Sequence, residues 1–505
     1  MWDSLLQGIS NFANLYNLMA IAGGMLMGVV VGAIPGLTGT MAVALALPFT
    51  FYMDPITGII LLVGIYKGAI YGGSISAILI KTPGTPAAAC TVMDGYPLAQ
   101  KGLARKALDM ALYASCVADF ISNISLIFFA GFIASFALRF GPPEFFLLIC
   151  FSLTIIAGVT GKSLIKGLIS AALGLLLATI GMDLVYGSDR LTFGNFDLMG
   201  GLNFIPVLIG LFALPELIDA AVRGVTGGKS DLHRLAGGGL TWGEFRHSLK
   251  SILRGSIIGV ILGAIPGIGG APAAFMSYSE AKRGSKTPDN FGQGELEGVA
   301  ASESGNNGCC GATMIPLLAL GVPGDVITAV ILGAFMVHNL TPGPMLFQQH
   351  LPLVYAIFVG IMLSSLMMLI MGKLCIRGFA KIADVPKKIL FPIVLVLCFF
   401  GSYAVNNSMF DVLSAVFMGV LGYIMLRLGI PEAPFLIAFI LGPMFEDNLR
   451  RSLLLSAGSP VIFFRSGICI FFMGITVLSI ALLVRRNLKQ RRQRNLACEM
   501  PNTQV

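Results

Sequence analysis

The chain has 505 residues, of which 56% are hydrophobic and only 11% are charged, and its mean hydropathy is +0.86. Soluble domains carry about 25% charged residues, so this composition excludes a soluble globular protein and predicts a helical protein with many membrane crossings. The formal net charge is +8, and the basic residues concentrate in a few connecting segments. That pattern is typical of cytoplasmic loops and not of a nucleic-acid-binding surface.

The two ends of the chain indicate its orientation. Residues 1–17 read as a short amphipathic lead, and no Lys or Arg precedes the first apolar run, which argues against a cleavable signal peptide. The first basic residue is Lys67, whereas residues 485–505 form a basic tail. The positive-inside rule therefore places the N-terminus outside and the C-terminus in the cytoplasm, with an odd number of crossings.

Apolar segments long enough for a bilayer of about 30 Å recur along the chain. In a first half, residues 1–222, we expect them at 18–51, 56–80, 109–138, 143–161, 163–182 and 204–222. A polar cytoplasmic linker, 223–250, leads to a second half, 251–484. Its membrane segments are expected at 251–278, 308–337, 353–372, 389–405, 411–426, 430–445 and 461–484, with a polar segment at 279–307.

One motif occurs once in each half. GAIPGLTG at 32–39 returns as GAIPGIGG at 263–270, and each copy is followed by a second Pro-Gly interruption, TPGTP at 82–86 and VPGD at 322–325. Proline removes a backbone donor and glycine weakens a helix. The residues that define the interruptions are Gly32, Pro35, Gly36, Gly39, Pro83, Gly263, Pro266, Gly267, Gly270, Pro323 and Gly324.

Interrupted helices at membrane depth are tolerated only where protein or a water-filled cavity satisfies the freed backbone groups. Matching interruptions in two halves are the sequence signature of a secondary transporter with a central site. Since the charge pattern places the two halves in opposite orientations, we predict an all-α polytopic membrane protein with two inverted-topology repeats. It would have about 11 crossings plus re-entrant segments. The alternative interpretation is that the glycines only allow close helix packing.

Four stretches carry a resemblance to a known family: GAIPGLTGTMAVALALPFTF, YGGSISAILIKTPGTPAAACTVMDGYPLAQKG, GAIPGIGG and ESGNNGCCGATMIPLLALGVPGD. Together they resemble the large membrane subunit of the tripartite tricarboxylate transporters, over nearly the full length. In the second motif, Gly269-Gly270-Ala271-Pro272 replaces the Thr38-Gly39-Thr40-Met41 of the first, so the two halves need not bind the same thing.

The resemblance implies a bacterial inner-membrane symporter that uses secondary transport and not ATP. Its partners would be a small membrane subunit of about four helices and a periplasmic solute-binding protein. The substrate would be citrate or another di- or tricarboxylate, and the only cofactor a coupling cation, Na⁺ or H⁺. The soluble partner would set much of the selectivity.

A carboxylate substrate needs hydrogen-bond donors and positive potential, which helix N-termini supply. For each Ser and Thr, the alternative is a local bond to its own helix. The candidate substrate-binding residues are Thr38, Ser74, Ser76, Lys81, Thr82, Gly84, Thr85, Ser304, Asn306 and Asn307, with Ser302 as a further polar residue.

Ionisable residues in apolar segments are functional candidates by default. Lys67 can be a structural ion pair, with Asp119 as the partner, or an interfacial side chain. Lys81 can bind an anion or extend to the interface. Asp325 and Glu303 are coupling-ion candidates; the alternatives are a helix cap for Asp325 and an exposed loop position for Glu303.

Two other functional classes are the alternatives to a carrier. An anion channel or a scaffold subunit without coupled transport would also use interrupted helices. An intramembrane enzyme would need a convergent catalytic constellation, and none is apparent in the sequence. The four histidines and nine cysteines show no metal-ligand spacing, so we predict neither catalytic residues nor a metal site.

Overall fold

The computed structural model describes residues 2–34, 36–159, 163–183, 187–223, 238–382 and 387–499. Within these residues nearly all regular structure is helical, and seven helices are long and apolar enough to cross a membrane. The prediction of an all-α polytopic membrane protein is therefore confirmed. The two-residue strands β1 (Gly181–Met182) and β2 (Asp189–Arg190) pair antiparallel.

The chain folds into two compact units. Residues 1–138 and 203–423 form the first unit, and residues 139–202 and 424–505 form the second. Each unit thus contains chain from both predicted halves. Residues 224–237 of the predicted linker lie outside the described residues, and the division of the chain at 223–250 stays a prediction.

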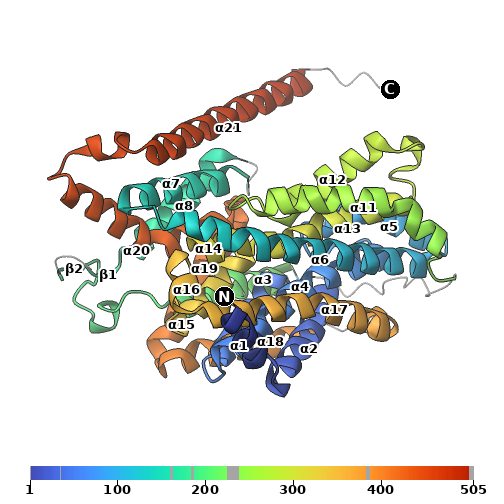
Figure 1. Ribbon diagram of the computed structural model, residues 1–505, viewed down its shortest axis with the longest axis horizontal. Helices are drawn as coiled ribbons and strands as arrows, with labels where there is room; N and C mark the ends of the chain where they lie inside the picture. The colour runs from blue at the N-terminus through green and yellow to red at the C-terminus, as the bar shows by residue number, and fades with distance from the viewer. Residues whose placement is uncertain are drawn as a thin grey trace. The chain divides into compact units, whose positions relative to one another are not determined.

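The first unit contains both copies of the repeated motif (Figure 1). Its N-terminal helices are α1 (Trp2–Phe12), α2 (Leu15–Ala33), α3 (Gly39–Thr50), α4 (Pro55–Ile80), α5 (Ala88–Gln100) and α6 (Ala104–Ala137). Its later helices are α9 (Phe204–Phe212), α10 (Leu214–Arg223), α11 (Trp242–Gly263), α12 (Gly270–Gly284), η2 (Pro288–Asn290), α13 (Leu296–Ala312), α14 (Met314–Leu320), α15 (Val326–Val337), α16 (Pro344–Gln349), α17 (Leu351–Ile382), α18 (Lys387–Asn406) and α19 (Met409–Leu428), the last of which continues into the second unit.

The second unit is smaller. Besides the two strands it consists of α7 (Pro142–Val159), α8 (Leu164–Ala178), η1 (Phe196–Leu198), α20 (Glu432–Leu455), η3 (Pro460–Phe464) and α21 (Gly467–Glu499). Helix α20 packs against α7 and α8, and α21 packs against α7. The chain around β1 and β2 is tied to α20 by ion pairs: Arg190 contacts Glu446 at 2.6 Å, and Arg450 contacts Asp183 at 2.8 Å.

The closest helix pair of the first unit depends on glycines at every fourth position. In α2, a Cβ at Gly24, Gly28 or Gly32 would collide with a backbone carbonyl oxygen of α4. In α11, Gly255, Gly259 and Gly263 meet α13 in the same spacing, and a Cβ at Gly259 would lie 2.6 Å from the Gly305 carbonyl oxygen. Small residues let helix backbones approach where no hydrophobic drive between helices exists.

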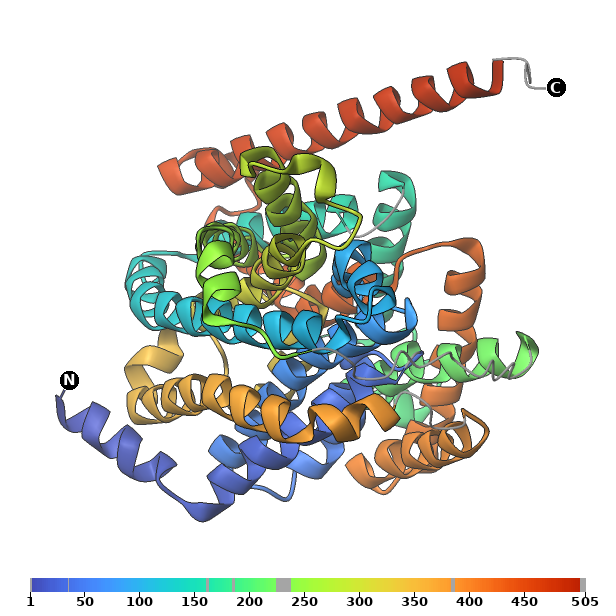
Figure 2. The same cartoon turned by 90° about the vertical axis from the view of Figure 1, so that its right-hand side faces the viewer.

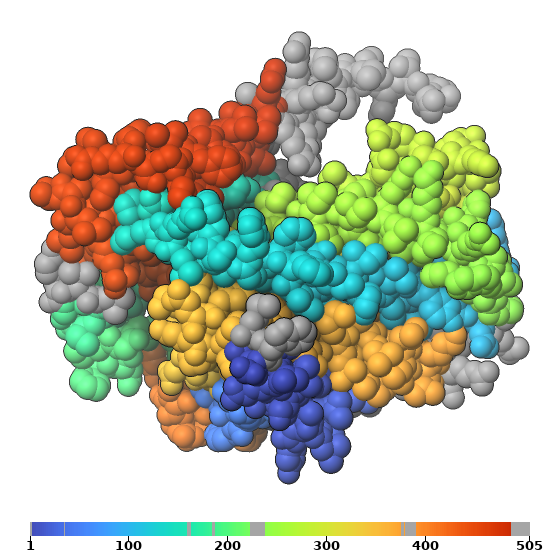
Figure 3. All heavy atoms as spheres, viewed as in Figure 1, coloured from blue at the N-terminus to red at the C-terminus, as the bar shows by residue number. Residues whose placement is uncertain are grey.

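The two segments that carry the motif pack in matching ways. Helix α2 packs along α4 as α11 packs along α13, and α3 contacts α4 as α12 contacts α13. The helix that follows each second interruption also packs on the other segment: α5 contacts α12 and α13, and α15 contacts α3 and α4. The long helix α6 packs against α13 and α17 packs against α4. Figures 1 and 2 show α6 and α17 alongside each other, and in Figure 3 they form neighbouring bands.

Two sequence boundaries differ from the structure. Helix α11 begins at Trp242, inside the predicted linker, because Thr241 and Glu244 form a capping box at its start. The predicted polar segment 279–307 is mostly helix, and α13 is buried from Gly298 to its end despite its many polar residues. The Glu303 and Asn307 side chains hydrogen-bond to side chains of other helices, which hydropathy alone does not anticipate.

Candidate functional site

The two interruptions of the first predicted half lie against each other. The Gly84 backbone N–H donates to the Gly73 carbonyl at 3.2 Å, and a Cβ at Gly84 would collide with the Gly32 carbonyl oxygen. Position 84 must therefore be glycine for this contact to form. Gly32 itself lies in α2 and Gly39 is the first residue of α3, so the interruption spans 34–38, with Pro35 outside the described residues.

The second half repeats this arrangement with a direct bond. The Gly267 N–H donates to the Gly324 carbonyl at 2.7 Å, and a Cβ at Gly269 would lie 3.6 Å from the Asp325 Cβ. Gly36 and Gly267, at equivalent motif positions, both have positive φ, 92° and 85°. In the second half the two interruptions are thus joined by a hydrogen bond, and in the first half the second interruption packs against the end of α2.

Contacts also join the interruptions across the two halves. Tyr66 of α4 donates its hydroxyl to Asp325 at 2.7 Å, at the start of α15. A Cβ at Gly39 would lie 3.2 Å from Ile327 of α15. A helix of the first half also reaches the second half: Cys90 of α5 contacts the Ala274 carbonyl of α12 at 3.6 Å. Four segments far apart in the sequence are therefore brought into one region.

The two halves differ in how far their interruptions are covered. In the second half, Pro266, Gly267, Pro323 and Gly324 are buried. In the first half, Gly36 and residues 81–83 are exposed, whereas Gly84 and Thr85 are buried. The backbone groups that the interruptions leave outside helices are thus buried by protein in the second half and partly exposed in the first. At membrane depth such groups are tolerated when protein buries them or when they line a water-filled cavity.

Several predicted polar residues make local bonds. Thr38 caps α3 by accepting the Met41 N–H at 3.2 Å, and Thr85 accepts the Ala88 N–H at 3.2 Å at the start of α5. Ser76 and Ser304 each donate to the carbonyl three residues earlier, at 3.1 Å. Thr82 donates to the Ile80 carbonyl at 3.3 Å. Whether any of them also contacts a substrate stays a prediction.

Lys81 is placed at the C-terminal end of α4 in the left-handed conformation, with φ 58°. It is exposed, and its ammonium group lies 5.6 Å from the centre of the Tyr96 ring. The side chain is therefore free to reach an anion beside the 81–87 interruption, and its role in anion binding stays a prediction.

Glu303 lies at the centre of a polar cluster that joins four helices. Its carboxylate accepts hydrogen bonds from Ser74 of α4 at 2.6 Å, from Thr91 of α5 and from Ser115 of α6 at 3.0 Å. The Asn307 amide donates to the same carboxylate at 3.4 Å and to Ser115 at 2.8 Å. The predicted residues Ser74, Asn307 and Glu303 are thus brought together in a fully buried position, not in an exposed loop.

Asp325 is the N-cap of α15. One carboxylate oxygen accepts the Thr328 N–H at 2.7 Å and the other accepts the Tyr66 hydroxyl. The Tyr66 hydroxyl also lies 3.3 Å from the Thr313 hydroxyl. Capping, one of the two interpretations of the sequence, is therefore realised, and a role in ion coupling stays a prediction.

Asn306 is buried, and neither side-chain polar atom has a hydrogen-bond partner among the described residues. Its side-chain oxygen lies 2.5 Å from the point where a Cβ on Gly270 would stand, beside the first residue of α12. The N-cap of that helix, Gly269, offers no side-chain cap. A buried amide without a partner costs free energy unless a ligand or water satisfies it.

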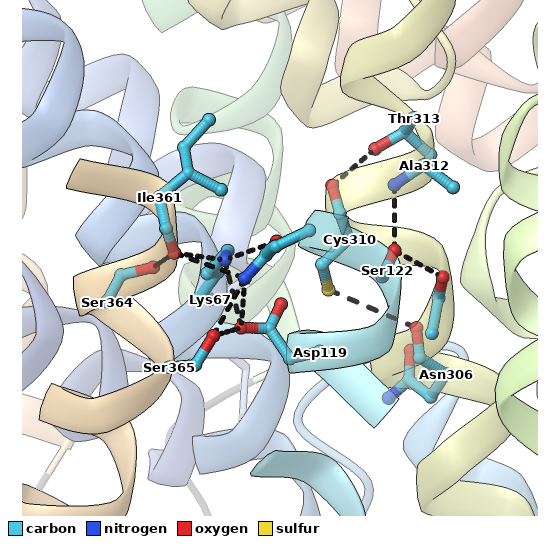
Figure 4. Close-up of polar contacts among 12 residues, drawn as sticks. Lys67, Asp119, Ser122, Asn306, Cys310, Ala312, Thr313, Ile361, Ser364 and Ser365 are labelled. Carbon is cyan, nitrogen blue, oxygen red and sulfur yellow. Dashed lines mark hydrogen bonds and ion pairs between the residues drawn. The ribbon is translucent and has the colours of Figure 1, made fainter. Parts of the chain in front are cut away.

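Lys67 forms the structural ion pair that one interpretation of the sequence anticipated. Its ammonium group lies 2.9 Å from Asp119, 3.0 Å from Asn123 and 3.1 Å from the Ile361 carbonyl (Figure 4). Ser365 donates to Asp119 at 2.5 Å. Helices α4, α6 and α17 therefore share one buried, hydrogen-bonded charge pair.

Sequence reasoning missed several members of these clusters. Ser115 and Ser122 were not predicted; they lie four residues before and three residues after the anticipated Asp119 on α6, which places all three on one helix face, and that spacing was the available signal. Asp94 was also missed. It accepts backbone N–H groups of Gly292 at 2.8 Å and Glu295 at 2.9 Å, and the Tyr278 hydroxyl at 2.7 Å, and so fixes α5 to the start of α13.

Two cavities lie away from the interruptions. One, about 700 Å³, is lined by residues of α11 and α12, including Arg254 and Arg283. The other, about 900 Å³, is an apolar groove between α6 and α17. Neither is lined by the residues of the Pro-Gly motifs.

Seven long apolar helices, interrupted helices held together and buried ionisable clusters define a polytopic membrane protein of the transporter class. The chain belongs to the tripartite tricarboxylate transporter TctA family, whose model matches residues 18–437. This is a transporter family and not an enzyme family, and its members belong to a system of three components.

Two relatives come from Agrobacterium vitis. One, described as "Uncharacterized 52.8 kDa protein in TAR-I ttuC' 3'region", is 36% identical over 475 residues, 93% of this chain and 94% of the relative. The other, described as "Uncharacterized protein in TAR-II ttuC' 3'region", is 36% identical over 234 residues, 46% of this chain and 97% of the relative. No solved structure matches this chain.

Proposed function

We propose that this chain is the large membrane subunit of an ion-gradient-driven carrier that imports di- or tricarboxylates. A periplasmic binding protein delivers the substrate, and a small four-helix membrane subunit completes the membrane part. The carrier lies in the bacterial inner membrane, with its N-terminus periplasmic and its C-terminus cytoplasmic. Coupling is to Na⁺ or H⁺.

The observation that carries the proposal is the pairing of interruptions, Gly84 against Gly32 and Gly267 bonded to Gly324. Such pairing makes little sense for a scaffold, because each break forfeits helix hydrogen bonds inside a bilayer. It suits a carrier whose two inverted repeats meet at the site and move relative to each other. The exchange of α5 and α15 between the two segments supports this assignment of repeats.

The chemistry of the region suits a carboxylate. Helix α12 begins at Gly270 without a side-chain cap, and the unpartnered Asn306 amide lies beside it. A helix N-terminus with free N–H groups and an amide donor is a site for an anion. Lys81 adds a positive charge at the exposed interruption of the first half.

The test is transport by proteoliposomes that contain both membrane subunits. The cognate binding protein is first screened against citrate and other di- and tricarboxylates by thermal shift, and the best ligand is used as radiolabelled substrate. We expect accumulation above the external concentration only with binding protein and an ion gradient. Dependence on ATP alone, or uptake that never exceeds the electrochemical gradient, would contradict the carrier.

The Lys81→Met variant tests the anion role within the same assay, with Lys282→Met, an exposed lysine of α12, as the matched control. Loss of one charged interaction with the substrate should raise the KM by roughly tenfold, since about 1.4 kcal/mol corresponds to a factor of ten. An unchanged KM and rate would remove Lys81 from the site.

A further inference from the structure

Glu303 is a buried carboxylate to which the packing of the first unit supplies no positive partner. It is fully buried in α13, and among the described residues no Lys, Arg or His lies within ion-pair distance of it. Asp119, equally buried, is paired with Lys67. A lone buried charge is expensive, and the group becomes neutral or acquires a cation.

The groups around Glu303 are oxygens suited to a small hard cation. Ser74, Thr91 and Ser115 each direct a hydroxyl to the carboxylate, and the Ser302 hydroxyl lies 3.2 Å from that of Thr91. The Asn307 side-chain oxygen is buried and has no hydrogen-bond partner among the described residues. Carboxylate, hydroxyl and amide oxygens are the ligands that hard cations prefer.

The other titratable groups near Glu303 do not neutralise it. Tyr71 of α4 and Cys90 of α5 are close enough to interact with it electrostatically, Cys116 of α6 lies near Tyr71, and Tyr278 of α12 contacts Asp94 of α5. Helix α11 meets this part of α13 through Gly255 and Gly259, and α14 carries no titratable residue. Each of these groups is neutral or acidic, so none supplies a positive charge.

The position of the cluster connects it to the interruptions. Ser74 lies near the end of α4 and Thr91 near the start of α5, so the two hydroxyls flank the 81–87 interruption. Both contact a residue of the second half, Glu303 in α13. A cation bound here therefore holds the chain on both sides of the first interruption against the opposite repeat.

We propose that Glu303, with the Ser74, Thr91 and Ser115 hydroxyls, is the site at which the carrier takes up its coupling cation, a proton or Na⁺. The inference rests on the proposed carrier function and assigns the cation to Glu303 and not to Asp325. Asp325 is only partly buried and is already engaged as the cap of α15. Neutralising Glu303 stabilises the packed arrangement, and release of the cation on the other side loosens it.

The experiment compares the whole complex carrying Glu303→Gln with one carrying Glu280→Gln, a carboxylate on α12 that pairs with Arg283. Proteoliposomes with both membrane subunits and the binding protein are given an inward Na⁺ gradient or a pH gradient with no Na⁺. In a third condition there is no ion gradient, and unlabelled substrate inside exchanges with labelled substrate outside. We expect Glu303→Gln to lose gradient-driven accumulation by roughly 5- to 150-fold, the range typical of coupled sites, while exchange continues.

The two cations are distinguished by the Ser74→Ala and Thr91→Val variants, which also keep the inference testable where Glu303→Gln does not fold. If the cation is Na⁺, both variants raise the Na⁺ concentration for half-maximal uptake. If it is a proton, the pH gradient alone drives the wild type and both variants shift the pH of half-maximal uptake. Gradient-driven accumulation by Glu303→Gln equal to that of Glu280→Gln, or no shift in either hydroxyl variant, overturns the inference. A wild-type complex that accumulates substrate under neither gradient overturns the carrier function itself.

Discussion

At the scale of single residues, the Lys67–Asp119 pair is the clearest case of a charge that the fold requires. Both side chains are almost fully buried, and Asn123 and Ser365 donate to the same Asp119 oxygen that meets Lys67. Removing one partner leaves an uncompensated buried charge, which is far costlier than removing both.

We therefore predict that Lys67→Met lowers the free energy of unfolding by about 3–5 kcal/mol. The double variant Lys67→Met with Asp119→Asn should recover most of the loss, because Asn keeps an acceptor for Ser365 without the charge. The measurement is thermal unfolding of the purified protein in detergent, with Lys282→Met as the control. A double variant no more stable than the single one would show that the pair contributes through packing and not through charge.

Which polar residues cluster around Glu303 was only partly predictable from the sequence. Ser74, Asn307 and Glu303 were all among the predicted site residues, and the structure places them in one cluster. No sequence feature pointed to Thr91, and the spacing of Ser115 on α6 indicated a shared helix face but not a contact with Glu303, because Glu303 lies about 200 positions further along the chain. Ser76 and Ser304 were predicted alongside them, yet each hydroxyl donates to a carbonyl of its own helix.

At the scale of helices, the start of α15 separates two roles of Asp325. Asn caps a helix about as well as Asp, whereas Ala loses about 1 kcal/mol. We predict that Asp325→Ala lowers the free energy of unfolding by that amount and that Asp325→Asn changes it by only a few tenths. Gradient-driven uptake should persist in Asp325→Asn, because the amide oxygen keeps the cap to the Thr328 N–H and the amide NH2 can donate to the Tyr66 hydroxyl, which then accepts. Loss of uptake in a stable Asp325→Asn protein would assign the coupling charge to this residue.

The glycine contact between α2 and α4 gives a second test at this scale. Gly28 and Gly23 lie on the same helix, but a Cβ at Gly28 would collide with the Ile65 carbonyl oxygen, whereas nothing lies within 4 Å of one at Gly23. Alanine favours a helix over glycine by about 1 kcal/mol, while overpacking costs about 1–3 kcal/mol.

Gly28→Ala should therefore lower the temperature of unfolding in detergent and Gly23→Ala should leave it unchanged or raise it. Equal effects of the two substitutions would mean that α2 and α4 are not in close contact in the membrane. Both outcomes are measured on protein of matched purity, with the wild type as the reference.

Helix positions followed well from hydropathy where the segments are apolar throughout. The run 56–80 corresponds to α4, and 109–138 to α6. Hydropathy did not predict helix α13. Seven of the ten residues 299–308 are Ser, Glu, Gly or Asn, yet the helix is buried. Hydropathy measures transfer from water to lipid, and α13 is surrounded by protein, where polar side chains find partners.

At the scale of the whole molecule, the charge distribution predicts the orientation of the termini. Alkaline phosphatase becomes active only in the periplasm, so a fusion to the N-terminus should be active. A fluorescent protein that folds in the cytoplasm should fluoresce when it is fused to the C-terminus. Both fusions reporting the same side would contradict an odd number of crossings and, with it, the opposite orientation of the repeats.

The matching packing of the two segments was visible in the sequence only as a repeated motif. GAIPG in each half indicated where the chain reverses, but not that α5 would pack on α12 and α13, or α15 on α3 and α4. That exchange depends on which helix faces remain open once α2 has covered α4 and α11 has covered α13.

By itself the sequence determined the membrane class, the family, the places where the helices break and the charge bias between the ends, because these depend on composition, short-range backbone chemistry and recognisable motifs. Only the tertiary structure decided that Glu303 is buried with no basic side chain beside it among the described residues, that Lys67 pairs with Asp119, and that the Gly267 N–H bonds to the Gly324 carbonyl. These features depend on contacts between residues far apart in the chain, and a buried charge becomes costly or useful only when its neighbours in space are fixed.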